Sequence, residues 1–96
     1  MASLEPNDSS TVRIHPQIIL RQVQDEAVLL NLDDGTYYGL NPVGARMLQV
    51  LHESADIGAA HRTLLDDYDV DPDQLRRDME HLIRDMQARN LVIVEP

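Results

Sequence analysis

The chain has 96 residues, of which 43% are hydrophobic, a size and composition typical of one small globular domain. It contains no cysteine, which excludes disulfide frameworks, cysteine-ligated zinc sites and thiol catalysis. Seventeen acidic residues against eight basic ones give a formal net charge of −9, which opposes binding to nucleic-acid phosphates or to an anionic membrane surface.

The first residues carry no targeting pattern. Residues 1–10 are polar and acidic, unlike the basic and then apolar start of a secretion signal. No stretch approaches the ~20 apolar residues that a membrane helix needs. The sequence therefore predicts a cytoplasmic protein without membrane attachment, with a disordered segment over residues 1–11 and one folded domain over residues 12–96.

Three short β-strands are predicted in the first half. Residues 18–23 form an apolar run, and residues 27–32 form another after the polar turn at residues 24–26. Asp-Asp-Gly at residues 33–35 is a hairpin signal. Residues 36–40, Thr-Tyr-Tyr-Gly-Leu, are rich in side chains that favour strands.

The pattern leaves two registers open for this hairpin. A two-residue loop would pair Leu32 with Tyr37, whereas a three-residue loop, with Gly35 in the left-handed region, would pair Leu32 with Thr36. We favour the three-residue loop, because it gathers five apolar side chains on one face. They are Val28, Leu30, Leu32, Tyr38 and Leu40.

Three helices are predicted in the second half. Asn41-Pro42 and Asp71-Pro72 each have the pattern of an N-cap followed by proline at the first helical position, and Ser54 is the expected cap of the middle helix. The third helix, over residues 72–89, has the clearest apolar stripe: Leu75, Met79, Leu82, Ile83 and Met86. Residues 91–94 are expected to form a short closing strand.

Three strands followed by three helices that cover one face of the sheet make an α+β fold. This arrangement of a three-stranded antiparallel sheet and three helices is related in outline to winged helix-turn-helix domains.

The residues offer little for catalysis. His81 and Asp85 lie one helical turn apart and could both reach a metal ion, but no third ligand accompanies them. No Ser-His-Asp pattern and no glycine-rich phosphate loop occurs. We therefore expect neither an enzyme nor a bound metal or cofactor.

The predicted strand over residues 36–40 points to a function. It is the last strand before the helices, so it is expected at the edge of the sheet, and it has no charge or proline to block further pairing. The closing strand could cover this edge, a second copy of the chain could pair with it, or it could accept an added peptide strand. The third helix would then form a second wall, with Met79, Ile83 and Arg76 on the groove and Leu75, Leu82 and Met86 in the core.

Residues 28–45, Val-Leu-Leu-Asn-Leu-Asp-Asp-Gly-Thr-Tyr-Tyr-Gly-Leu-Asn-Pro-Val-Gly-Ala, resemble the signature of the PqqD-like family. The similarity extends over about residues 12–94. Members are recognition elements for RiPPs (ribosomally synthesised, post-translationally modified peptides), and they bind the leader peptide of a precursor. The resemblance implies that the leader adds as a strand to the sheet edge, beside the third helix. The implied leader-binding residues are Thr36, Tyr37, Tyr38, Gly39, Leu75, Arg76, Met79, Leu82 and Ile83.

The hairpin is more similar to the stand-alone members of lasso peptide biosynthesis than to the member of the pyrroloquinoline quinone (PQQ) pathway, which has a Pro-Glu-containing strand. The resemblance thus implies delivery of a lasso precursor to a leader peptidase and to an ATP-dependent ring-forming enzyme, the lasso cyclase. Two alternatives remain. One is a PQQ-type peptide chaperone for a radical SAM enzyme. The other is a winged-helix DNA-binding protein that uses residues 72–89 for recognition, which the net charge opposes.

Overall fold

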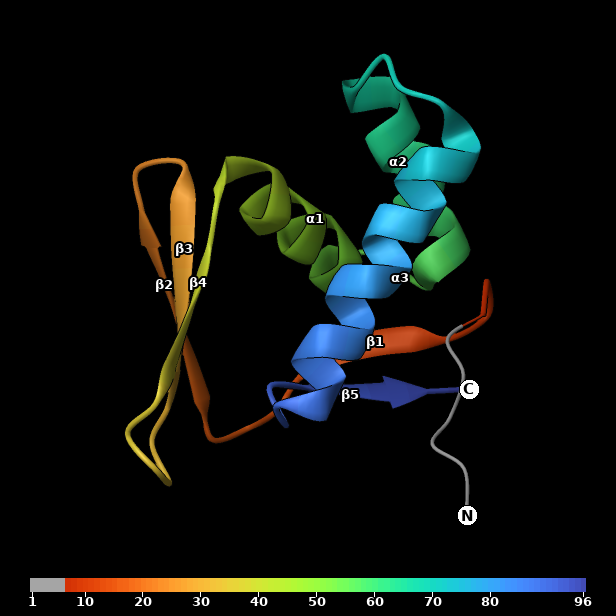
Figure 1. Cartoon of the computed structure of the whole chain (residues 1–96). Coiled ribbons are helices and arrows are strands. Elements are labelled where there is room, and N and C mark those ends of the chain that lie inside the picture. Colours follow the sequence, from red (N-terminus) through yellow and green to blue (C-terminus); the bar gives the residue numbers. More distant parts are fainter. Residues whose placement is uncertain (1–6) are drawn as a thin grey trace.

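A computed structural model describes residues 7–96 of the chain as three helices and two antiparallel sheets. Strands β2, β3 and β4 form one layer, the helices pack on one side of it, and β1 and β5 lie beneath the helices (Figure 1). The predicted α+β class, with a three-stranded antiparallel sheet and three helices, is confirmed. The elements are β1 (Thr11–Ile14), β2 (Ile18–Val23), β3 (Glu26–Asn31), β4 (Tyr37–Leu40), α1 (Pro42–Glu53), α2 (Ile57–Asp67), α3 (Pro72–Ala88) and β5 (Val92–Glu95).

The second sheet joins the two ends of the described chain. β1 pairs with β5 in an antiparallel ladder that runs from Thr11 opposite Glu95 to Ile14 opposite Val92. The sequence predicts the closing strand but not β1. The partner of β1 lies at the other end of the chain, so no local hairpin signal accompanies it.

The segment before β1 also differs from the expected disorder through residue 11. Ser10 is fully buried, and its carbonyl accepts a hydrogen bond of 2.8 Å from the Ile57 N–H at the start of α2. The Asp8 carbonyl accepts one of 3.0 Å from the Gly58 N–H. Residues 7–11 are therefore held against α2, while residues 1–6 of the predicted disordered segment lie outside the described residues.

The β3–β4 hairpin has neither of the two predicted registers. Leu29 lies opposite Tyr38 and Leu30 opposite Tyr37. In the register we favoured, Leu30 would lie opposite Tyr38, so the observed pairing is shifted by one residue along β3. Leu32, expected on the core face, lies in the loop and is 59% exposed. The predicted face is thus wrong for β3: Ala27, Leu29 and Asn31 are buried and face the core, while Val28 and Leu30 lie on the other face.

Asn31 is the physical reason for this register. Its carbonyl accepts a hydrogen bond from the Gly35 N–H (2.9 Å), and its side chain accepts one from the Asp33 N–H (2.9 Å). Gly35 has a φ of +73°, in the left-handed region that glycine adopts without strain. Asn31, which closes the loop with these hydrogen bonds, is therefore the buried residue on the core face, where Leu32 was expected.

The helices begin largely where the caps predict. The Asn41 side chain accepts a hydrogen bond from the Gly44 N–H, and the Asp71 side chain accepts one from the Gln74 N–H. The middle helix is capped by Asp56 rather than Ser54. The Ser54 N–H and hydroxyl both donate to a carbonyl of α1, so this residue ends the first helix.

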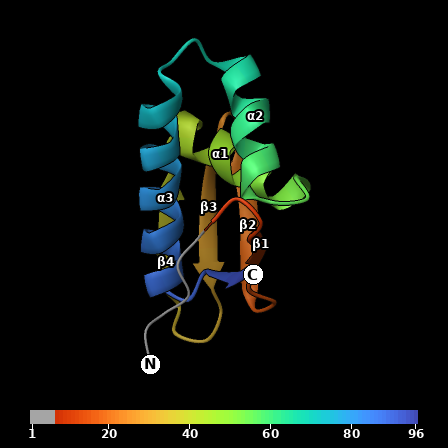
Figure 2. The ribbon, with the colours of Figure 1, turned by 90° about the vertical axis from the view of Figure 1, so that its right-hand side faces the viewer.

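α1 is the central helix, since it packs against both sheets and against α2. The largest fully buried hydrophobic side chains come from the main sheet and from all three helices: Leu29, Leu48, Ile57, Leu64, Met79, Ile83 and Met86. In the side view, α3 lies on the side of the sheet where β4 is, away from β2 (Figure 2). Among residues 7–96, no helix is both long and apolar enough to cross a membrane.

Candidate functional site

β4 has an open outer edge. It pairs with β3 alone, in the sheet order β2-β3-β4, while β5 pairs with β1 on the other side of the helices. The possibility that the closing strand covers β4 is therefore excluded. Within residues 7–96, no strand pairs with the outer edge of β4.

The phase of the β3–β4 ladder identifies which backbone groups lie on that edge. The Asn31 N–H donates to the Thr36 carbonyl at 2.8 Å. Because hydrogen-bonded and non-hydrogen-bonded pairs alternate along an antiparallel ladder, the pairs that contain Tyr37 and Gly39 are non-hydrogen-bonded. The N–H and C=O groups of Tyr37 and Gly39 therefore point outward and are available to another strand.

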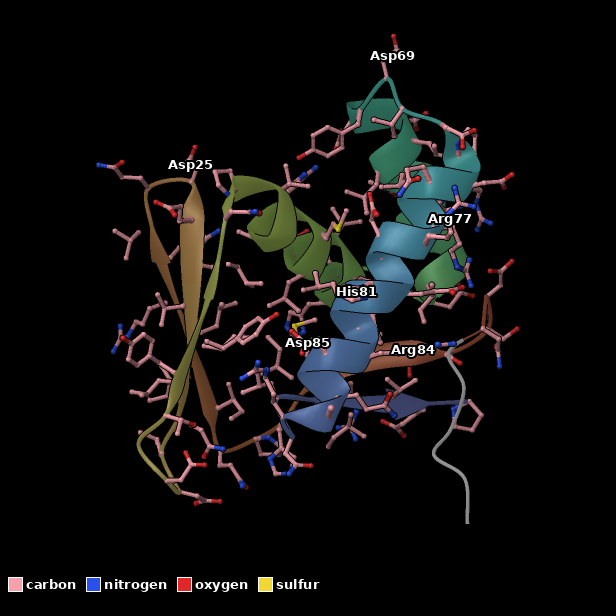
Figure 3. The ribbon with its side chains drawn as sticks, in the orientation of Figure 1. Asp25, Asp69, Arg77, His81, Arg84 and Asp85 are labelled. Carbon is pink, nitrogen blue, oxygen red and sulfur yellow. The ribbon has the colours of Figure 1, made fainter. Side chains whose placement is uncertain are left out.

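Tyr38 connects β4 to α3. Its hydroxyl donates a hydrogen bond of 2.6 Å to Asp85 Oδ2, and the Arg89 guanidinium carbon lies 5.0 Å from the centre of its ring. Figure 3 shows Asp85 on the side of α3 that faces the sheet, whereas Arg77 and Arg84 project to the other side in that view. This contact holds the helix alongside the edge strand.

The protonation of this pair is well defined at neutral pH. Burial, together with the hydrogen bond to Asp85 and its negative charge, raises the pKa of Tyr38 to about 12. The same hydrogen bond lowers the pKa of Asp85, and the Arg89 guanidinium adds to that effect. A neutral hydroxyl thus donates to a charged carboxylate between strand and helix.

A groove runs between β4 and α3 and is floored by α1; we call it the β4–α3 groove. Its first part is a hollow of about 300 Å³ whose lining includes Tyr38, Gly39, Val43 and Leu82. Its second part, about 160 Å³, lies between α1 and the start of α3. The two parts share Val43, Met47 and Asp78, and the second part adds Tyr68, Val70 and Leu75. The second part is therefore mostly apolar, whereas the first part combines apolar side chains with the polar groups of Asn41 and Asp78.

A larger hollow of about 470 Å³ lies beside the β2–β3 turn and α1. Two of its three charged lining residues, Arg46 and Asp67, are paired with each other, with 2.7 Å between Nη2 and Oδ2. It does not adjoin the free backbone groups of β4. We therefore take the β4–α3 groove as the candidate site.

Residues 26–92 match the family model described as coenzyme PQQ synthesis protein D (PqqD). The chain belongs to the PqqD family. This confirms the resemblance drawn from the hairpin and the Leu-Asn-Pro segment.

Two solved structures resemble this PqqD-family protein closely. "TbiB1 in complex with the TbiA(beta) leader peptide" is 30% identical, with a TM-score of 0.78 over 83% of this chain and 93% of that one. "Lasso peptide synthetase B1 complexed with the leader peptide" is 24% identical, also with a TM-score of 0.78, over 85% and 96% of the two chains. At that lower identity the second likeness concerns the fold alone. No curated protein matches the sequence significantly.

The structure brings most of the predicted β4 residues of this PqqD-family protein to the groove or its rim. Thr36 immediately precedes β4, and Tyr38 and Gly39 line the groove. Tyr37 points to the outer face of the sheet and is 77% exposed.

On α3, the predicted division between groove and core is wrong for three residues, while Leu75 and Met86 are buried as predicted. Met79 and Ile83 are fully buried in the core, whereas Leu82 is partly exposed and lines the groove. Leu75 is almost fully buried and touches only the second part of the groove. The apolar stripe is wider than one contact needs, and its spacing alone does not tell which half of it faces the sheet edge.

Arg76 does not face the groove. Its guanidinium pairs with Asp8, in the segment before β1, and with Glu80 at 3.0 Å. The expectation that it holds an acidic residue of a ligand in the groove is therefore wrong. Asp8 had been assigned to a disordered segment, so this pairing was not foreseen.

Several groove residues were missed by sequence reasoning. Val43 and Met47 come from α1, which was expected only to cover the sheet, and Asp78 was taken as part of a solvated face, as was Asp85, which does not line the groove but binds Tyr38 at its edge. Val70 could have been identified from the sequence, because it is a lone apolar residue between two aspartates. In the structure it is 46% exposed and lines the second part of the groove. In the described part of the chain, no group of three His, Asp or Glu residues is placed to hold a metal ion.

Proposed function

We propose that this protein is a RiPP recognition element that binds the leader peptide of a lasso peptide precursor along the open edge of β4. The observation that carries the proposal is that a groove with apolar side chains from α1 and α3 lies beside that open edge. The 30% identity to TbiB1, which has been solved with a leader peptide bound, supports the same conclusion.

The mode of binding is β-strand addition. The leader backbone exchanges hydrogen bonds with Tyr37 and Gly39, which gives affinity without regard to sequence. Alternate side chains of the leader enter the β4–α3 groove and contact Tyr38, Val43 and Leu82. Ordering a free peptide costs several kcal/mol, so these apolar contacts must supply more than that.

The protein acts by delivery and not by catalysis. A leader held on β4 leaves the rest of the precursor free to reach a leader peptidase and an ATP-dependent lasso cyclase. Binding of this complex to either enzyme raises the effective concentration of the substrate there. The PQQ-type alternative would use the same groove but pass the peptide to a radical SAM enzyme.

The test is a titration of the protein into a fluorescein-labelled synthetic leader, taken from the precursor encoded beside this gene, with anisotropy as the readout. We expect a Kd in the micromolar range or tighter, which corresponds to about −8 kcal/mol or more favourable. Leu82→Asp should weaken binding at least tenfold, because it places a charge on the apolar wall of the groove.

The matched control is Ala55→Asp, which adds the same charge in the exposed connection between α1 and α2 and should leave the Kd unchanged. Both variants should keep the wild-type circular dichroism spectrum. Absence of wild-type binding at tens of micromolar would contradict leader recognition. Equal Kd values for wild type and Leu82→Asp would remove the groove from the site.

The DNA-binding alternative gains no support. Asp78 and Asp85 lie on the groove side of α3, and the net charge of −9 repels phosphates. The similarity of the architecture to winged helix-turn-helix domains stays a prediction and is not an argument for DNA binding.

A further inference from the structure

Gly39 has no reason in the fold to be glycine. It lies within β4, where β-branched and aromatic residues are preferred and glycine costs conformational entropy. Its φ is not in the left-handed region, unlike that of Gly35. A Cβ built on Gly39 meets no atom within 4 Å, whereas one on Gly44 or Gly58 comes within 3.3 Å of a neighbour. A glycine inside a strand without such a cause is typical of a place where another chain approaches closely.

The missing side chain leaves a hollow on the outer face of the sheet, which we call the outer hollow. It has a volume of about 440 Å³ and is lined by Val23, Glu26, Val28 and Gly39, which alternation along the strands puts on the face opposite the β4–α3 groove, together with Ala27, Leu40 and Asn41. Val28, directly opposite Gly39 in the ladder, and Val23, 61% exposed, give it apolar walls. Glu26 contributes a carboxylate to its lining.

A strand added to β4 would have side chains on both faces of the sheet. Those beside Tyr38 enter the β4–α3 groove, and those beside Tyr37 and Gly39 lie on the outer face. Because the N–H and C=O of Gly39 point to the open edge, the added residue opposite it pairs with it directly. A side chain at position 39 would occupy the space into which that residue projects.

We propose that the outer hollow is a second subsite for the leader and takes one large apolar side chain. The inference rests on the proposed function and goes beyond it, because it has the leader recognised on both faces of the edge strand. Val23 and Val28 select an apolar residue, and Glu26 disfavours an acidic one at the same position. The occupant is the bound leader because the hollow adjoins the backbone groups to which the leader pairs.

Gly39→Val tests the subsite with a change that the fold accepts. The Cβ enters open space and valine favours strands, so the melting temperature should stay the same or rise. Binding of the labelled synthetic leader should nevertheless weaken at least tenfold, with a smaller loss for Gly39→Ala. If neither variant folds, the fold itself requires the glycine and the proposal is overturned.

A coupling experiment separates steric filling of the hollow from general damage to the edge. Each leader residue is replaced by alanine in turn, and every peptide is titrated against wild type and Gly39→Val. One large apolar leader residue should matter to wild type, with at least a tenfold loss on replacement, but should cost Gly39→Val nothing.

The possible outcomes distinguish the two proposals. Equal affinity of wild type and Gly39→Val would show that the outer hollow stays empty while leader recognition stands. A loss in Gly39→Val without any coupled leader residue would assign the effect to distortion of β4, and would also overturn the subsite. If wild type itself does not bind the leader, the proposed function fails first.

Discussion

Tyr38 sets the distance between the edge strand and the helix that faces it. Its ring leaves β4 toward α3, and its hydroxyl ends on the Asp85 carboxylate at 2.6 Å. Arg89 lies over the ring at 5.0 Å and also reaches Asp85 at 3.3 Å. Three side chains therefore hold one wall of the β4–α3 groove to the other, and the width of the groove depends on them.

Tyr38→Phe removes this connection while keeping the ring. We expect a loss of about 1 kcal/mol in the free energy of unfolding at pH 7, the usual value for one hydrogen bond. Because the bond lowers the pKa of Asp85 below its ordinary 3.8, the stabilisation is present above that pH and is lost as the pH falls through the lowered value. The contribution of Tyr38 to stability depends on pH in the opposite direction. Its pKa is raised from 10 to about 12, so this contribution is fully present below pH 10 and is lost as the pH rises through about 12.

Urea unfolding of wild type and Tyr38→Phe between pH 7 and pH 3 measures this difference. The gap between the two proteins should shrink as Asp85 becomes protonated. Asp85 is 39% exposed, so solvent screening keeps the effect small. A gap that stayed constant over the whole pH range in which Asp85 becomes protonated in the folded protein would show that the charge of Asp85 plays no part.

At the scale of the element, β4 is a strand with two unlike edges. The backbone groups of Tyr38 point to β3 and hold the hairpin, while those of Tyr37 and Gly39 point outward. Neighbouring residues of one short strand should therefore respond differently to the loss of an N–H group. Proline is tolerated in a strand only where its missing N–H would face away from the sheet.

Tyr37→Pro should leave the protein folded but weaken leader binding at least tenfold, since it removes a donor from the open edge. Tyr38→Pro should unfold the hairpin, because its N–H faces β3. Tyr37→Ala is the control for the lost ring and keeps the N–H. Circular dichroism and leader anisotropy on the three variants give the comparison. Equal affinity of Tyr37→Pro and Tyr37→Ala would argue against strand addition.

The elements were predictable where their signals are local. Cap-and-proline pairs such as Asn41-Pro42 mark helix starts within a few residues, and alternating apolar runs mark the strands of the main sheet. β1 was not predictable, because it becomes a strand only by pairing with β5 across nearly the whole chain. The hairpin register failed for another reason: the loop is closed by Asn31, a polar residue on the core face, so hydrophobicity pointed to the wrong face.

The groove that forms the candidate site was predictable in its position between strand and helix but not in its detailed lining. An uncharged last strand next to a broad helical stripe located the groove between β4 and α3. The assignment of Met79 and Leu82 to groove and core was reversed, because both lie on the same wide stripe and only the packing of α3 separates them. The α1 residues Val43 and Met47 could not be placed there without knowing that α1 lies beneath the groove.

At the scale of the whole molecule, the core is thin and the chain is short. A chain of 96 residues buries a smaller share of its surface than a larger domain does, so its stability is expected to be modest. A peptide added along β4 would extend the three-stranded sheet and cover the apolar walls of the groove. Under the proposed function, the leader therefore stabilises its own carrier.

This gain appears as a thermal shift. A leader at 100 times its Kd should add about 2.7 kcal/mol to the free energy of unfolding. For a domain of this size, each kcal/mol raises Tm by roughly 4–8 °C, so the total increase should be about 10–20 °C. Differential scanning calorimetry with and without the leader checks this, with Leu82→Asp as the variant that should gain far less. An unchanged wild-type Tm at that leader concentration would mean that the leader does not prefer the folded state.

The β1–β5 sheet has a consequence for how this domain can be combined with others. It brings Thr11 and Glu95 side by side, across the helices from β4 (Figure 1). A tether attached at either position leaves from the back of the molecule and does not cross the peptide edge. Fusion to an enzyme next to either of these residues should therefore leave the outer edge of β4 accessible. The same holds for a circular permutant in which a short linker connects the two positions.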